Sequence, residues 1–194
     1  MQHKISAEKF GVRLRPADLD DAGLIVHLRN SQHALEFIGD SAKNVPEQEA
    51  WLKRYFERPN DYCFMIETTY NAKTVGMLGV YGIEGELGEW GRWVLEPGVP
   101  AAPASAWLAL HVCFDVLGLK TVRGLVVETN KEVLSFHKRA GYELIGFHPE
   151  PRMIGGKQVR MVEFRTTSLE WPVMASSLGR YALMAQQFME GCDA

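Results

Sequence analysis

Three titratable side chains stand where they could move a proton. His137 lies in a helix-forming segment, and an imidazole with an ordinary pKa near 6.5 gives or takes a proton close to neutral pH. Glu128 follows one β-rich run and Glu89 begins another, so either carboxylate could face a cleft beside those strands. Each also has a plainer interpretation. A histidine flanked by two cations is often a surface or packing residue, and both glutamates could be solvated or salt-bridged.

A second chemical feature is the turn from 98 to 105, between a strand and a helix. The first turn of a helix has unpaired backbone N–H groups, and at the carboxyl end of a strand these can hold a pyrophosphate. Pro97, Pro100 and Pro103 supply no N–H, whereas small side chains at 101, 102 and 104 let a phosphate approach closely. An ordinary Pro/Ala helix start is the alternative. The available donors are Gly98, Val99, Ala101, Ala102, Ala104 and Ser105.

These residues must be positioned by the central elements of the chain. Three β-rich runs separated by turn residues, 62–69, 74–81 and 89–96, predict an antiparallel meander. A Pro/Ala-rich segment then opens a helix over 97–119, and a strand over 121–127 follows it. This strand–helix–strand order predicts a parallel crossover between 89–96 and 121–127. A helix over 130–140 comes next and ends at Gly141.

The flanking segments complete an α/β (α+β) fold. Val12 to Pro16 suggests an opening strand, a first helix ends near Asn30, and a second helix starts near Pro46. The polar stretch between them, 31–44, is expected to be a loop or broken helix over a substrate cleft. After Gly141 we expect strands over 142–149 and 159–169, with a turn at Gly155-Gly156. An amphipathic helix over 173–189 ends the chain.

The sequence therefore predicts one domain over 1–194, with about 171–194 as an added helical extension. Its mixed, mostly antiparallel sheet should have about seven strands flanked by helices. The 21 Lys+Arg against 24 Asp+Glu, in no block of one sign, give no reason to expect a nucleic-acid partner. Three cysteines without metal-ligand spacing predict reduced thiols in a cytoplasmic protein and no bound metal, and no segment is apolar enough to enter a membrane.

The segment from Glu89 to Phe147 resembles the cofactor-binding half of a GCN5-related N-acetyltransferase (GNAT). The likeness rests on the strand–helix–strand–helix order and on Asn130, His137, Gly141 and Tyr142, which match the family's Asn-(x)6-Tyr/His-(x)3-Gly-Phe spacing. The usual Arg/Gln-x-x-Gly-x-Gly/Ala loop is represented here by Pro97, Pro100 and Ala102, of which the last agrees. The sequence has none of the HExxH, GxSxG or P-loop motifs of other enzyme classes.

The resemblance implies acetyl-CoA as cosubstrate and direct transfer to a primary amine. It implies that the backbone of Trp93, Val94 and Leu95 polarises the acetyl carbonyl and that Asn130 meets the pantetheine arm, although Asn130 is also a routine helix N-cap. His137 takes the place of a tyrosine that protonates the departing thiolate. The glutamates Glu89 and Glu128 are then candidate bases for the amine.

Within the family, Gln48-x-x-Trp51, Glu89-Trp90-Gly91 and Phe136-His137 look most like PseH-type enzymes, which acetylate a nucleotide-linked amino sugar. Ribosomal-protein N-terminal acetyltransferases of the RimJ/RimL type share the layout and are the second choice. The first choice implies a negative acceptor met by Arg29 or Arg92, with Trp51 beside it. A GNAT-shaped binding module without turnover is a third hypothesis, since the loop lacks the usual Arg and glycine. The C-terminal helix is compatible with a homodimer.

Overall fold

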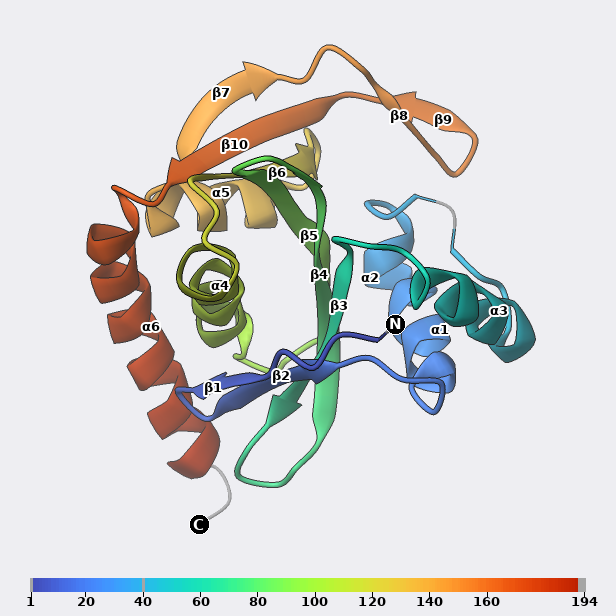
Figure 1. Cartoon of the computed structure of the whole chain (residues 1–194), viewed down its shortest axis with the longest axis horizontal. Coiled ribbons are helices and arrows are strands. Elements are labelled where there is room, and N and C mark those ends of the chain that lie inside the picture. The colour runs from blue at the N-terminus through green and yellow to red at the C-terminus, as the bar shows by residue number, and fades with distance from the viewer. Residues whose placement is uncertain (1, 40, 192–194) are drawn as a thin grey trace.

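The computed structural model describes residues 2–39 and 41–191, and an eight-stranded sheet forms its centre (Figure 1). The strand order is β1-β2-β3-β4-β5-β6-β10-β7, in which β5 and β6 are parallel and the other neighbours antiparallel. The strands are β1 (Ala7–Lys9), β2 (Val12–Pro16), β3 (Tyr62–Thr68), β4 (Thr74–Glu84), β5 (Leu87–Leu95), β6 (Thr121–Val127), β7 (Glu143–Phe147) and β10 (Met161–Thr167), and a separate hairpin pairs β8 (Arg152–Ile154) with β9 (Lys157–Val159).

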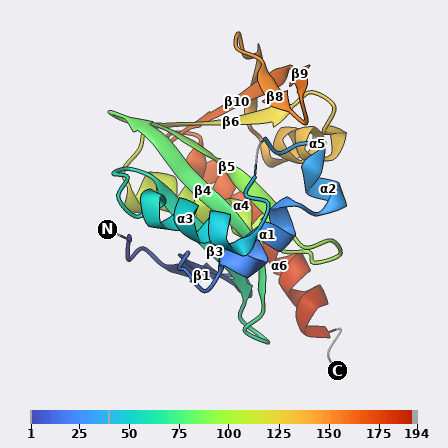
Figure 2. The same ribbon diagram turned by 90° about the vertical axis from the view of Figure 1, so that its right-hand side faces the viewer.

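Helices cover both faces of this sheet. One face carries α1 (Ala22–Arg29), α2 (Gln32–Leu35) and α3 (Val45–Tyr55), and the other carries α4 (Ala102–His111), α5 (Lys131–Ala140) and α6 (Trp171–Gly191) (Figures 1 and 2). Both faces are therefore buried, and β3 shows it: Phe64 and Ile66 belong to the core under α4, whereas Cys63 and Met65 belong to the core under α1 and α3. The alternation follows from the two-residue period of a strand.

The helix ends follow local rules. Asn44 accepts a hydrogen bond from the backbone N–H of Glu47 and so caps α3, and Asn130 caps α5 through the N–H of Val133. Gly141 ends α5 in the left-handed region, with φ of 94°, where a glycine has no Cβ penalty. The α4 helix continues as a π-helical turn, η1 (Val112–Val116).

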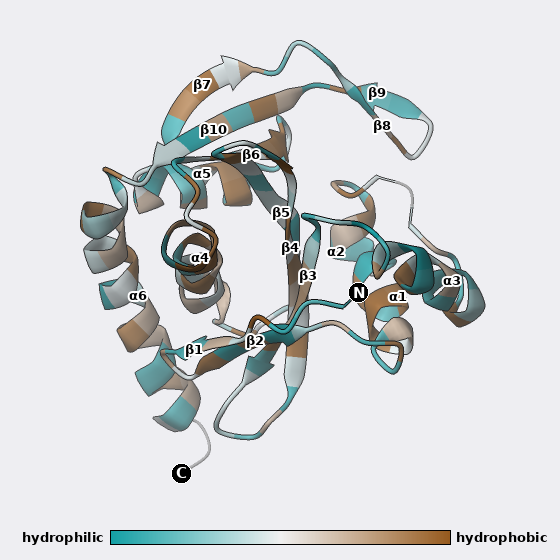
Figure 3. Cartoon of the chain, viewed as in Figure 1, coloured by the Kyte–Doolittle hydropathy of each residue, from teal (hydrophilic) through white to brown (hydrophobic). Residues whose placement is uncertain are grey.

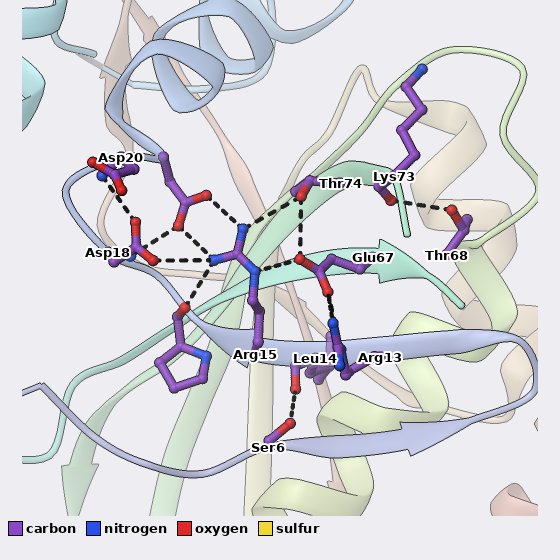
Figure 4. A network of polar contacts seen from close by, with 12 residues as sticks. Ser6, Arg13, Leu14, Arg15, Asp18, Asp20, Glu67, Thr68, Lys73 and Thr74 are labelled. Carbon is purple, nitrogen blue, oxygen red and sulfur yellow. Dashed lines mark hydrogen bonds and ion pairs between the residues drawn. The ribbon is translucent and has the colours of Figure 1, made fainter. Parts of the chain in front are cut away.

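A polar network ties β2 to β3, β4 and the start of α1 (Figure 4). The guanidinium of Arg15 donates two hydrogen bonds of 2.7 Å to Asp21 and a third to Glu67, and Arg13 also donates to Glu67. Burial alone would raise the pKa of Glu67, but the hydrogen bonds from Arg15 and Arg13 lower it. This cluster lies at the junction that carries α1 away from the sheet.

The α6 helix belongs to the main core of the molecule. It runs beside α4, the most evenly apolar helix in Figure 3, and the Trp107 indole N–H donates to the carbonyl of Ala175 at 3.0 Å. Its inward side chains are buried in the same cluster as those of α4, whereas a second set faces solvent. The buried set is Trp171, Met174, Leu178, Ala182 and Met189.

The predicted α/β fold with a parallel crossover is confirmed, and several bounds are corrected. The main sheet has eight strands in place of about seven, because the short β1 was not predicted. The helix expected from 97 begins at Ala102, since Pro97 and Pro100 disfavour helical pairing in the preceding loop, whereas Pro103 lies in the first turn of the helix. The run 159–169 divides into β9 and β10, and the turn at Gly155-Gly156 joins β8 to β9.

Within residues 2–39 and 41–191, no helix is long and apolar enough to cross a membrane. Over the same residues, no group of three or more His, Cys, Asp or Glu side chains could hold a metal ion.

Candidate active site

The candidate site is a fork between β5 and β6. The two strands pair over three positions, from Leu87↔Thr121 to Glu89↔Arg123, and then part. A cleft of about 400 Å³ opens where they separate, within the size range of small-molecule sites. Both strands, α5, the segment after α2 and the β8–β9 hairpin line it, through Arg29, Phe37, Ile38, Gly39, Tyr81, Trp90, Gly91, Arg92, Trp93, Gly124, Leu125, Val126, Val127, Asn130, Val133, His137, Arg152, Ile154 and Met161.

A β-bulge in β5 shapes the wall of this cleft. Gly79 pairs with Gly91 and Met77 with Val94, so Leu78 alone faces both Arg92 and Trp93. Arg92 has φ of 51°, a left-handed conformation that is rare outside glycine. The bulge turns the β5 backbone beside the cleft and places two neighbouring side chains, Arg92 and Trp93, in its lining.

His137 lies in the cleft wall inside an aromatic cluster. It is 3 % exposed, and its ring centroid lies 4.8 Å from that of Tyr142 and 4.9 Å from that of Phe164. Its Nδ1 is 2.8 Å from the carbonyl oxygen of Val133, and because a carbonyl can only accept, Nδ1 carries the proton. Burial lowers the pKa of His137 to about 4.

The imidazole is therefore neutral at pH 7, and its lone pair is on Nε2. The resemblance implies that His137 protonates the departing thiolate. In the structure the neutral ring has its Nδ1–H held by a backbone carbonyl, so Nε2 carries no proton to give before it has accepted one. Such a ring first accepts a proton and can then return it.

Glu89 lies directly at the fork but is held by its neighbours. The Tyr81 hydroxyl donates to it at 2.9 Å, Arg123 at 3.2 Å and Arg152 at 3.4 Å, and Glu89 is 4 % exposed. Burial and the Glu89 carboxylate together raise the pKa of Tyr81. Three donors leave this carboxylate poorly placed to accept a proton from a substrate, so its contacts suit a role in fixing Tyr81 and Arg152 in the cleft.

Glu128 is directed away from the cleft. It forms a two-oxygen ion pair with Arg160 at distances of 2.7 to 3.1 Å, and the hydrogen bonds from Arg160 lower its pKa. Of the three residues proposed for proton transfer, the structure thus brings His137 to the cleft, Glu89 to its edge and Glu128 to the surface.

The expected acceptor residues gather on the α1–α3 side. Arg29 and Arg92 line the main cleft and also a second, smaller pocket of about 180 Å³, where they meet Trp51. Two hydrogen bonds to Asp61, one of 3.0 Å, hold Arg92 and raise its pKa although burial opposes the charge. Arg29 donates to the hydroxyl of Ser41 at 3.0 Å, and burial, together with the nearby charge of Arg92, lowers its pKa.

The residues expected to hold the cofactor divide into two groups. Trp93 and Asn130 line the cleft, and Val94 and Leu95 continue β5 beyond it. The loop residues form the turn between β5 and α4: Gly98 has φ of 82°, and Ala101 and Ala104 are buried. The backbone N–H of Val99 already donates to the carbonyl of Glu96, and that of Ser105 to the carbonyl of Ala101. The Ser105 hydroxyl accepts a hydrogen bond from the Trp93 indole. The remaining donors at this turn are those of Gly98, Ala101, Ala102 and Ala104.

Sequence reasoning did not predict several lining residues. Tyr81 lies opposite Glu89 in the β4–β5 register, so aligning the two strands of the meander could have found it. Arg152 and Ile154 belong to the hairpin around Gly155-Gly156, whose turn was predicted without its strands. Phe37, in the segment after α2, packs against the cluster that contains Ile154 of the hairpin, and this contact between distant segments left no local signal in the sequence.

Comparison with known proteins identifies the family. The family model described as an acetyltransferase (GNAT) domain matches residues 12–143. The chain belongs to the GNAT acetyltransferase family. The fork and the bulge of this N-acetyltransferase lie within the matched region, and so does the cleft lining apart from Arg152, Ile154 and Met161.

Solved structures share this GNAT fold over nearly the whole chain. A GCN5-related N-acetyltransferase from Brucella melitensis has a TM-score of 0.79 at 19% identity, covering 93% of this chain and 86% of that one. FdhC, a nucleotide-linked sugar GNAT in its apo form, has a TM-score of 0.78 at 21% identity, covering 93% of this chain and 99% of that one. A mutant of spermidine N-acetyltransferase SpeG from Vibrio cholerae has a TM-score of 0.73 at 17% identity, covering 84% of this chain and 97% of that one.

No curated protein matches the sequence. The PseH-type and RimJ/RimL-type resemblances therefore remain predictions about the subtype of this GNAT enzyme.

Proposed function

We propose that this enzyme transfers an acetyl group from acetyl-CoA to the amino group of a nucleotide-linked amino sugar. The observation that carries the proposal is the charge of the cleft. Arg29, Arg92 and Arg152 line it, and none of the described residues in its lining is Asp or Glu. Guanidinium groups bind phosphate through two parallel hydrogen bonds, so a cleft of this kind suits an acceptor that carries phosphate.

The same charge argues against a polyamine acceptor. The comparisons include enzymes for a nucleotide-linked sugar and for spermidine, which differ in the sign of the acceptor's charge. Arg92 is paired with Asp61 and Arg152 with Glu89, whereas Arg29 contacts the hydroxyl of Ser41. A guanidinium such as that of Arg29 in a partly desolvated cleft repels a polycation, because like charges interact strongly where water is excluded. A nucleotide-linked sugar supplies the opposite charge and still presents a neutral sugar amine.

The fork suits the cosubstrate. Beyond Glu89 the β6-facing edge of β5 has no strand partner, so its backbone groups are available to an extended chain with amides, as in the pantetheine arm. The N–H groups of the 98–104 turn lie at the carboxyl end of the same strand, where a pyrophosphate would bind. Acetyl-CoA supplies the activated thioester; the chain supplies the alignment.

His137 would carry the proton between the two reacting groups. As the amine forms its C–N bond, Nε2 of the neutral imidazole takes the proton that the nitrogen loses. When the C–S bond breaks, the imidazolium returns that proton to the sulfur and is neutral again. Burial among Trp90, Tyr142 and Phe164 disfavours the charged ring, which opposes uptake of the proton from the amine and favours its return to the sulfur. No covalent intermediate on the enzyme is required.

An acceptor survey tests this function. Purified enzyme with acetyl-CoA would be offered a nucleotide-linked 4-amino sugar, spermidine and a peptide with a free N-terminus, and release of the CoA thiol would be followed. We expect turnover with the sugar nucleotide and at most background with spermidine. Turnover of the peptide alone would contradict the proposal, and calorimetry without acetyl-CoA binding at millimolar concentration would favour a module without turnover.

Arg29→Met provides the test at the level of the site. Removal of one guanidinium from a phosphate contact should raise the acceptor KM about tenfold or more and leave the acetyl-CoA KM unchanged. The matched control is Arg180→Met on the exposed face of α6, which should change neither. Equal effects of the two substitutions would show that Arg29 does not contact the acceptor.

A further inference from the structure

The second pocket contains an amide that the fold leaves unused. Gln48 lies on the buried face of α3, one and two turns from Leu52 and Tyr55, and is 4 % exposed. Within residues 2–39 and 41–191 its side-chain amide has no hydrogen-bond partner, and it lines the pocket. The fully buried side-chain N/O atoms without a partner among the described residues belong to His3, Trp90 and Tyr142 and not to Gln48, so this amide is open to the pocket, where a ligand can complete its hydrogen bonds.

The walls of this pocket suit a flat ring. Ile25 and Met77 form an apolar floor and Trp51 an aromatic wall. Tyr55 stacks on Trp51 with an interplanar angle of 5°, and the guanidinium carbons of Arg58 and Arg92 lie 5.8 and 5.5 Å from the Trp51 ring centroid. These contacts fix the indole in one orientation, and it lines the pocket beside the two guanidiniums, where a planar group would meet it.

The position of the pocket relative to the cleft gives the order of the groups along a ligand. Arg29 and Arg92 line both spaces and therefore stand between them. A ligand that extends from the fork toward α3 places its reacting group near His137, passes the two guanidiniums, and ends at Gln48 and Trp51. An amino sugar, a diphosphate and a nucleobase occur in that order in a nucleotide-linked sugar.

From this geometry we infer that Gln48 and Trp51 form a nucleobase-recognition site, in which the Gln48 amide pairs with the donor and acceptor edge of the base while Trp51 packs against its face. The inference rests on the proposed function and extends it to the choice of the nucleotide that is linked to the amino sugar. A primary amide offers one acceptor and one donor side by side, which complements a neighbouring N–H and C=O on a base. A glutamine in this position reads the base, whereas the arginines read phosphate irrespective of the base.

Calorimetric titration of the full chain with UDP, dTDP, GDP and inorganic pyrophosphate tests the site. We expect at least one nucleoside diphosphate to bind about tenfold or more tightly than pyrophosphate, since the base adds hydrogen bonds and stacking. Gln48→Leu should remove about tenfold or more of that preference and leave pyrophosphate binding unchanged. The matched control Gln187→Leu, on the exposed side of α6, should keep the full preference.

The outcomes separate the inference from the function beneath it. Equal binding of pyrophosphate and all nucleoside diphosphates, or a preference that survives Gln48→Leu, overturns the base site even if a nucleotide-linked amino sugar is acetylated. If Gln48→Leu loses the preference for a nucleoside diphosphate over pyrophosphate, the base site is supported. This holds even if the acceptor survey finds no turnover of the sugar nucleotide and the proposed function fails. Thermal unfolding of Gln48→Leu at the wild-type temperature shows that the loss is local. Gln48→Glu, which keeps size but loses the donor, should weaken the preferred base as well.

Discussion

At the scale of single residues, His137 has both a proposed catalytic role and a packing role. Its Nδ1 hydrogen bond and its aromatic neighbours hold it as a neutral ring, and the same burial that sets its proton chemistry makes it part of the core. The sequence position alone predicted a residue able to titrate near neutral pH. The direction of its pKa shift depends on Trp90, Tyr142 and Phe164, which come from three different segments, and so was not predictable locally.

This burial predicts an effect of pH on stability. In the unfolded chain the pKa of His137 is near 6.5, and in the folded chain it is about 4. Between these values the unfolded state binds the proton and the native state does not, so the free energy of unfolding falls as the pH falls from 6.5 toward 4. The full effect corresponds to about 3 kcal/mol.

Urea unfolding from pH 7.5 to 4.5 measures this effect in wild type and in His137→Phe, which keeps an aromatic ring in the cluster. The phenylalanine variant should lose less stability on acidification, since it has no proton to bind. His148→Phe, at a partly exposed histidine outside the core, should follow the wild-type curve and serves as the control. Parallel curves for all three proteins would show that His137 does not set the pH dependence.

At the scale of elements, strand and helix positions followed from local patterns, but the shape of the site did not. The spacing of apolar residues, with Pro46 at the start of α3 and with Asn130 and Gly141 at the two ends of α5, predicted both helices well. The bulge at Arg92 and the parting of β5 from β6 depend on register with β4 and on three rungs of parallel pairing. Register is a relation between strands, so neither strand shows it by itself.

The role of Asn130 can be decided by comparison with a second cap. Asn130 and Asn44 both accept a hydrogen bond from a backbone N–H three residues later, at 3.2 and 3.0 Å. Replacement of either by alanine should cost about 1 kcal/mol of stability. Only Asn130 lines the cleft among these two, so Asn130→Ala should in addition raise the KM for acetyl-CoA several-fold.

Steady-state kinetics and chemical unfolding of both variants check this prediction. Asn44→Ala should keep the wild-type KM at the same loss of stability. An unchanged KM in Asn130→Ala would restrict this asparagine to the cap.

At the scale of the whole molecule, the sequence correctly indicated an α/β chain with a mixed sheet and a final helix. Its treatment of that helix as an addition is open to test, because the structure buries one side of α6 in the main core. The exposed side, with Tyr181, Met184 and Phe188, gave the amphipathic pattern that the sequence showed. The pattern predicts a helix with two sides but does not say how much of the core depends on it.

A buried and an exposed leucine on α6 test how much the stability of the core depends on this helix. Leu178 is 1 % exposed and Leu183 is 49 % exposed. Leu178→Ala should lower the free energy of unfolding by about 3 kcal/mol, because it leaves a cavity beside α4, and Leu183→Ala should lower it by less than about 1 kcal/mol. Equilibrium unfolding in urea measures both values. A loss below about 1 kcal/mol for Leu178→Ala would show that α6 is a separable extension.

The β8–β9 hairpin has a consequence for how this enzyme could diverge. Arg152 and Ile154 close the cleft from a segment that lies after residue 143, where the match to the family ends. The hairpin pairs with itself and not with the eight-stranded sheet, so its length and sequence can vary without a change in the register of any catalytic strand. One wall of the cleft is thus encoded apart from β5 and β6, and exchange of residues 150–160 between relatives is expected to change the shape of the cleft while the fork keeps its register.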